Sequence, residues 1–316
     1  ENVEIHHNLL HEDEDNGWFM VYDRISGMGG IIRSQGNSSG KMVLKNCYIH
    51  DNQYRDLDAH TPAQYWYEPE TYKVEDQPLA GQGGAINWRS GRNYKNTSDG
   101  PLIESELIIR NCTIVRNCAK EGGAISTCAK TTFKKDGDGY TYISKNHAVN
   151  GGGLMFWPYN DGQLSYAGDG FNVTLGGEGF NEDGSAYVRV FDNYASQTGG
   201  GAYIVIDPTD DVGFDTDNNP RDASYVAYFG TGCAINNNRA PQGAGVAIID
   251  NAAKRHVGYR ATTPDNYTYQ MINPVRFKVS GELSREITID GAHICDNYTS
   301  TEGTFPDKAE GAGIYI

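Results

Sequence analysis

The sequence is short of positive charge, of long apolar runs and of helical patterns. Its 41 Asp and Glu residues outnumber 26 Lys and Arg, and the net charge of −15 argues against nucleic acid or an anionic membrane surface as a partner. No apolar run approaches the length of a membrane span, so we expect no span in this segment. No helix-period segment of useful length is present, while 39 glycines and 21 tyrosines suit a turn-rich β protein.

Neither terminus carries a processing or capping signal. The chain does not begin with Met and opens with no secretory signal, so we expect a processed or excised piece. It enters an expected strand at Val3 and stops at Gly313–Ile316 in the middle of a repeat, with no polar or helical cap. We therefore expect either a segment of a longer solenoid or a filament subunit.

A short phrase recurs along the whole chain. It consists of a branched apolar anchor, two variable residues, an asparagine, and later a glycine-rich turn that leads into an apolar run. Its seven anchors are Ile5, Ile49, Ile114, Ile143, Val190, Ile235 and Ile294. Its asparagines are Asn8, Asn52, Asn117, Asn146, Asn193, Asn238 and Asn297. A repeat this short cannot fold alone, so the copies must stack on one another.

The phrase predicts strands and sharp corners. Residues before the asparagines alternate, as Cys112 and Ile114 do, and period two with branched apolar residues predicts a short strand with one buried face. Such strands, meeting their copies in the next repeat, predict an all-β parallel β-helix of about seven coils, roughly 4.8 Å apart. The asparagines should turn the chain through a left-handed backbone or a side-chain bond, and should bond to one another in a ladder. The glycines should occupy corners where positive φ or close backbone approach favours no side chain.

The glycine turns Gly83-Gly84-Ala85-Ile86 and Gly122-Gly123-Ala124-Ile125 resemble the repeats of the chlamydial polymorphic membrane proteins. They match that family's Gly-Gly-Ala-(Ile/Leu/Val) motif, whereas Ile or Val stands where its Phe-x-x-Asn motif has Phe. The resemblance spans the chain but covers about a third of its residues. It implies a right-handed coil and a passenger-type surface adhesin, similar to autotransporter passengers, and it implies no catalytic residues.

The spacing between anchors is uneven, from 29 to 65 residues. The excess should leave the rod as loops, at about 9–24, 53–80, 156–182, 206–226 and 250–285 of a single domain over 1–316. Loops at matching corners of a rigid scaffold would form a second surface, which is the best candidate for binding.

Two of these loops have a distinct composition. Clustered aromatics in the second either stack on a ligand such as a sugar ring or pack the loop against the rod: Tyr54, Tyr65, Trp66, Tyr67 and Tyr72. Alternate oxygen ligands in the fourth are arranged as in a calcium loop: Asp215, Asp217, Asn219 and Asp222. That run lacks the glycine and distal glutamate of an EF-hand, so a solvated acidic loop is the alternative to calcium.

Six cysteines leave the redox compartment open. Cys47, Cys112 and Cys233 stand two residues before their anchors, where an inward thiol behaves as a small apolar group. We expect Cys47 and Cys112 to lie as a stacked pair of thiols. Cys118 and Cys128 flank a glycine corner and could close a short loop as a disulfide.

Four Asn-x-Ser/Thr sites fall in expected loops and are candidate glycosylation sites: Asn37, Asn96, Asn172 and Asn266. Asn297 has the same signature but should be committed to the ladder. His6, His7 and His11 cluster near the start. Because His6 and His7 are adjacent on an expected strand, they should point to opposite faces, which argues against a shared metal.

These observations predict an extracellular or cell-surface structural and adhesive protein. Its β-helix scaffold would present loops to a host or cell-surface glycan or protein, or would stack end to end with copies of itself into a fibre. No cofactor is expected apart from calcium. The alternative is a polysaccharide lyase or glycoside hydrolase of β-helix type, which needs two or three acidic groups, or an acid with a base, beside a groove. The expected strands supply no obvious set, so no catalytic residue is assigned.

Overall fold

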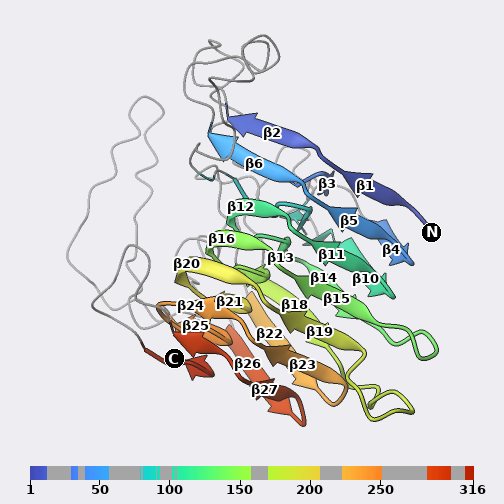
Figure 1. The fold of residues 1–316 in the computed structure, drawn as a ribbon, viewed down its shortest axis with the longest axis vertical. Coiled ribbons are helices and arrows are strands. Elements are labelled where there is room, and N and C mark those ends of the chain that lie inside the picture. The colour runs from blue at the N-terminus through green and yellow to red at the C-terminus, as the bar shows by residue number, and fades with distance from the viewer. Residues whose placement is uncertain are drawn as a thin grey trace, which may run out of the picture.

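The computed structural model describes residues 1–12, 30–34, 40–56, 79, 81–89, 91–92, 102–103, 105–157, 170–206, 223–250, 283–299 and 310–316. Every regular element within these ranges is a strand, and none of the residues there forms a helix that could cross a membrane. The strands build four parallel sheets (Figure 1). One antiparallel pair, β8 (Gly91–Arg92) with β9 (Leu102–Ile103), lies outside them. The predicted all-β class is confirmed.

Two of the four sheets hold the strands that the repeated phrase predicts. Sheet A contains the anchors, in β1 (Glu4–His6), β5 (Tyr48–His50), β11 (Thr113–Val115), β15 (Thr141–Ser144), β19 (Val188–Phe191), β23 (Cys233–Asn236) and β27 (His293–Cys295). Sheet C follows the glycines, in β3 (Ile32–Arg33), β7 (Ile86–Arg89), β13 (Ile125–Cys128), β17 (Leu154–Phe156), β21 (Ala202–Ile206), β25 (Val246–Asp250) and β29 (Ile314–Tyr315). Anchors lie opposite anchors, since Ile114 pairs with both Ile49 and Ile143.

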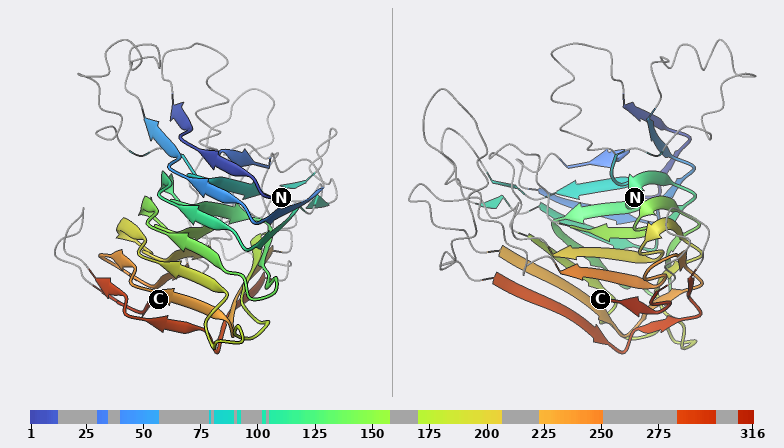
Figure 2. Two further views of the ribbon diagram at one scale, coloured as in Figure 1. Left: turned by 45° about the vertical axis from the view of Figure 1, so that its right-hand side comes forward. Right: turned by 90° about the vertical axis from the view of Figure 1, so that its left-hand side faces the viewer.

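The other two sheets are not marked by the phrase. Sheet B follows the asparagines, in β2 (Leu9–Glu12), β6 (Gln53–Asp56), β12 (Cys118–Glu121), β16 (His147–Asn150), β20 (Tyr194–Thr198), β24 (Arg239–Ala240) and β28 (Tyr298–Thr299). Sheet D precedes the anchors, in β4 (Gly40–Lys45), β10 (Ser105–Arg110), β14 (Lys130–Phe133), β18 (Gly170–Leu175), β22 (Ala223–Gly230) and β26 (Leu283–Asp290). From β10 onward the chain passes through the sheets in the order D, A, B, C, and Figure 2 shows successive passes stacked from blue to red.

The predicted insertions are therefore too wide. Strands β2, β6 and β18 lie wholly within the ranges 9–24, 53–80 and 156–182, and β22 and β26 begin within 206–226 and 250–285. In β18 the buried Phe171, Val173 and Leu175 alternate with outward residues, so the segment is a regular strand with one inner face.

The hydrophobic core draws on sheets A, C and D. Anchors such as Ile114 and Ile143 are fully buried and join one cluster with Ile125 of sheet C and Phe133 of sheet D. Sheet B contributes its own buried row of small side chains, Ala119, Ala148, Ala195 and Ala240. Each repeat therefore buries its inner residues only against its neighbours and the facing sheets, which is why a single copy could not fold.

The predicted asparagine ladder is confirmed. The Nδ2 atom of each asparagine donates to the Oδ1 atom of the next, at 2.8 to 3.1 Å, along the whole series from Asn8 to Asn297. From Asn52 onward, the second Nδ2 hydrogen goes to the anchor carbonyl of the preceding repeat, for instance from Asn146 to Ile114 at 3.0 Å. Each inner amide is thus saturated although it is buried, which removes the cost of desolvating it.

The left-handed residue at this corner lies one position before the asparagine. Seven residues with φ of 54° to 55° occupy it: His7, Asp51, Arg116, Lys145, Asp192, Asn237 and Asp296. None is glycine, and such a backbone costs an ordinary residue about 1 kcal/mol. The turn is therefore made by the preceding residue, which leaves the asparagine amide for the ladder.

The two glycines of the next corner are required for different reasons. The first has positive φ, as at Gly122 (68°) and Gly151 (67°). The second meets the backbone of the neighbouring pass, because a Cβ atom on Gly123 would lie 2.3 Å from the carbonyl oxygen of Gly152 and 2.7 Å from that of His147. Both predicted reasons for the glycines are confirmed, each at its own position.

Candidate functional site

A row of aromatic and cationic side chains runs along the outer face of sheet B. The register aligns His147, Tyr194, Arg239 and Tyr298, which we call the aromatic strip. The rings of His147 and Tyr194 are 4.9 Å apart, and the Arg239 guanidinium carbon lies 5.5 Å and 6.0 Å from the ring centres of Tyr194 and Tyr298. Tyr298 is 52% exposed. The strip follows from the parallel register, which repeats one outward position in every pass.

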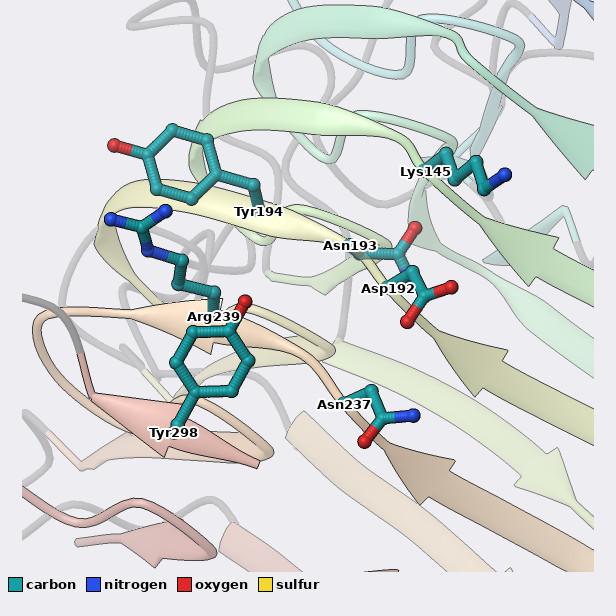
Figure 3. A pocket seen from close by; sticks show the side chains of 7 residues that line it. All are labelled: Lys145, Asp192, Asn193, Tyr194, Asn237, Arg239 and Tyr298. Carbon is teal, nitrogen blue, oxygen red and sulfur yellow. The ribbon is translucent and has the colours of Figure 1, made fainter. Parts of the chain in front are cut away.

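The aromatic strip borders a hollow of about 490 Å³. Its other wall is the left-handed corner, which contributes Lys145, Asp192 and Asn237 (Figure 3). Figure 3 shows Arg239 between the two tyrosine rings and the corner residues on the far side of Asn193. The hollow combines flat rings with two cations, one carboxylate and the amide of Asn237, a composition that suits a polar ligand with a flat face.

A buried carboxyl group lies at the end of β12. Burial raises the pKa of Glu121 to about 7, against a weaker opposing hydrogen bond from Asn150 Nδ2 to Oε1 at 3.3 Å. Its Oε2 atom is buried without a hydrogen-bond partner. Burial, and secondarily the charge of Glu121, raises the pKa of Tyr203 to about 12. Sequence reasoning missed this group, whose only mark is its place directly before Gly122-Gly123.

One group of side chains in the described ranges could hold a metal ion. A nitrogen of His7, a nitrogen of His50 and a carboxylate oxygen of Asp51 lie within 4.8 Å of one another. The prediction that His6 and His7 diverge is wrong, because their Nδ1 atoms are 2.6 Å apart. The physical reason is that β1 ends at His6 and His7 is left-handed, so strand alternation does not continue through it.

Most residues of the two predicted loop sites lie outside the described residues. This holds for the calcium ligands Asp215, Asp217, Asn219 and Asp222 and for the aromatics Tyr65, Trp66, Tyr67 and Tyr72. Tyr54 is described: it belongs to β6, is 7% exposed and packs with Ala119. For Tyr54 the packing alternative is therefore correct.

The structure does not form the disulfide that Cys118 and Cys128 could make. Both are thiols, on β12 of sheet B and β13 of sheet C. The predicted stacked thiols are confirmed, since Cys47 and Cys112 are buried and the backbone N–H of Cys47 donates to Cys112 Sγ at 3.5 Å.

The candidate glycosylation sites Asn37, Asn96 and Asn266 lie outside the described residues. Asn172 is exposed, but it lies within β18 and pairs with Lys130 and Val226, so its predicted loop position is wrong. Asn297, which also has the glycosylation signature, belongs to the ladder as predicted: its Oδ1 accepts from Asn238 and its Nδ2 donates to the carbonyl of Ile235.

No family model, curated protein or solved structure matches this chain. The functional argument therefore depends on the fold and on the side chains described above.

Proposed function

We propose that the chain is a single right-handed parallel β-helix, with its four sheets as the faces of successive coils. The constant order of the sheets and the unbroken asparagine ladder support this architecture. Parallel strands joined by crossovers strongly favour the right-handed sense. The expected single domain over 1–316 belongs to the same proposal.

On this scaffold we place the function of an extracellular or cell-surface structural and adhesive protein. The observation that carries the proposal is the aromatic strip beside its hollow: ring faces suit sugar rings, and Arg239 and Lys145 suit a carboxylate on the sugar. The net charge of −15 fits a soluble exterior molecule. Burial of all cysteines except Cys295 shields their thiols from pairing in an oxidising environment.

The test is an array of neutral and carboxylate-bearing oligosaccharides, probed with the intact chain. We expect binding of acidic glycans that falls at least ~10-fold in Arg239→Ala and in Tyr298→Ala. Arg189→Ala is the matched control, because Arg189 lies 6.0 Å and 5.9 Å from the rings of Tyr142 and Phe191 on sheet A, outside the hollow. The proposal is overturned if both strip variants bind acidic glycans as the wild type does, or if the wild type binds no glycan on the array.

End-to-end association into a fibre is part of the proposal. Among the described strands, β1 and β27 lie at the two edges of sheet A, where a strand of a second copy would add in the same parallel manner as each internal step. Sedimentation velocity over a range of concentrations tests this, because fibres grow with concentration and a monomer does not.

The alternative, a polysaccharide lyase or glycoside hydrolase, requires acidic groups that reach a substrate. Glu121 has a pKa suited to a general acid, but its free Oε2 atom is shielded from solvent. Asp51, Asp192 and Asp296 share the left-handed corner, where turn geometry accounts for them. The described residues therefore favour the scaffold function over the enzyme.

A further inference from the structure

The group formed by His7, His50 and Asp51 is built by the stacking of two passes. Strands β1 and β5 pair with His6 opposite His50, so the next residues, His7 and Asp51, come to the same left-handed corner. One nitrogen of each histidine and one carboxylate oxygen thereby converge within 4.8 Å. His7 is 43 positions from His50 and 44 positions from Asp51 in the sequence. The hydrogen bond from Asn8 to Asn52 in the ladder holds the backbone next to these residues in place.

The orientation of His50 is set before any ion binds. Its Nε2 atom is 3.0 Å from Glu4 Oε1, and its Nδ1 atom is 2.5 Å from Asp51 Oδ2. The contact from Nε2 to Glu4 is the carboxylate–histidine arrangement that orients metal-binding imidazoles. Nδ1 and Asp51 Oδ2 share a proton at 2.5 Å, and an ion that binds there takes the place of that proton and releases it to solvent. The ring itself is held between those of Tyr48 and His6, at 4.0 Å and 5.0 Å, and is 7% exposed.

The carboxylate of Asp51 keeps room for a ligand. Arg116 Nε donates to Asp51 Oδ1 at 2.7 Å, and Arg116 Nη2 donates to Asp51 Oδ2 at 2.6 Å. A carboxylate has about four lone-pair sites, so the contacts from Arg116 leave it able to bind a cation as well. His6 places another imidazole nitrogen beside the set, 2.6 Å from His7 Nδ1.

We propose that His7, His50 and Asp51 bind a divalent transition-metal ion of the Zn²⁺ class, with Glu4 as a positioning residue. Two imidazoles and one carboxylate match Zn²⁺, which takes nitrogen and oxygen ligands in a tetrahedral arrangement, and do not match Ca²⁺, which takes oxygen alone. The fourth position falls to water or to His6. Because His7 follows β1 and the other two ligands lie at and just after the end of β5, the ion ties β1 to β5, the strand that pairs with it in sheet A. Binding to the folded state then raises its stability.

The test uses the intact chain, stripped with a chelator and titrated with ZnCl₂ by calorimetry. We expect one saturable Zn²⁺ site, a weakening of at least ~10-fold in His7→Ala and Glu4→Ala, and a weakening of ~100-fold in His50→Ala. His293→Ala is the matched control, an exposed histidine at the other end of sheet A, and should bind as wild type does. Excess Ca²⁺ should not compete.

A second measurement separates the site from folding effects. His7 is exposed, so His7→Ala should keep the strand signal in circular dichroism while losing the rise in melting temperature that Zn²⁺ gives the wild type. Co²⁺ should give the visible spectrum of a nitrogen and oxygen site without a thiolate charge-transfer band. Wild-type affinity in His7→Ala, no saturable binding, or a thiolate band would each overturn the proposal.

Discussion

Asn117 gives both its backbone N–H and its Nδ2–H to one atom, Oδ1 of Asn146, at 2.9 Å and 3.1 Å. The same double contact joins every neighbouring pair of ladder asparagines, for example Asn146 to Asn193 at 3.0 Å twice. The ladder therefore links the side chains and the main chain of adjacent passes at the same corner.

Replacing Asn146 by alanine should break the ladder in its middle. It removes the acceptor of Asn117 and the donor to Ile114 and Asn193, and leaves these groups buried. Since a buried unsatisfied group costs about 1–3 kcal/mol, we expect the free energy of unfolding to fall by about 3 kcal/mol. Urea denaturation measures it. Asn172→Ala, which removes an exposed amide on β18, should change little, and equal effects of the two variants would refute the ladder's role.

Replacing Gly123 by alanine should destabilise the chain through a backbone clash. Its φ is ordinary, so the effect isolates the missing space: a Cβ atom would stand 2.3 Å from the Gly152 oxygen. Because that oxygen belongs to a paired main chain that cannot rotate away, we expect a loss of about 3 kcal/mol in the free energy of unfolding. Gly40→Ala is the control, since nothing lies within 4 Å of its Cβ position. Thermal melts of the two variants that coincide would contradict the close approach.

The strands that carry a repeated motif can be predicted from the sequence, and the strands that carry none cannot. Anchors and asparagines recur with fixed chemistry, so their alignment is predictable, as Ile114 opposite Ile143 shows. Strand β18 is not predicted because it lies outside the repeated phrase and shows only the alternation of inward and outward residues. The hollow beside Arg239 and the cluster at His50 depend on which outward residues become neighbours across passes. That pairing follows only once the uneven lengths between anchors have been resolved into a register.

The thiols should differ sharply in reactivity. Burial raises the pKa of Cys112 to about 11 and that of Cys233 to about 12, whereas Cys295 is exposed. A thiolate-directed reagent such as iodoacetamide should therefore label one site in the folded chain, and all six cysteines after unfolding. Intact-mass spectrometry counts the adducts, and Cys295→Ser should abolish labelling of the folded form. Two unlabelled cysteines after unfolding without reductant would indicate a disulfide, and peptide mapping would show whether it joins Cys118 to Cys128.

Glu121 makes stability depend on pH in an unusual direction. Burial raises the pKa of Glu121 from 4.5 to about 7. The hydrogen bond from Asn150 and the charge of Lys120 favour the ionised form, but they oppose this shift only weakly. Between these values the folded chain keeps the proton and the unfolded chain has lost it. The folded state therefore binds more protons there, and this group's contribution to stability falls as the pH rises through that window.

We expect Glu121→Gln to remove this fall. The wild type should lose up to about 3 kcal/mol between pH 4.5 and pH 7 relative to the variant, and the gap should stay constant above the folded-state pKa. Urea denaturation at a series of pH values gives both curves. Glu106→Gln is the control of opposite sign, because the hydrogen bond from Lys41, and then that from Lys130, lowers the pKa of Glu106 against its burial. A pH profile of Glu121→Gln that runs parallel to the wild type would show that the buried carboxyl ionises freely, so that its burial perturbs nothing.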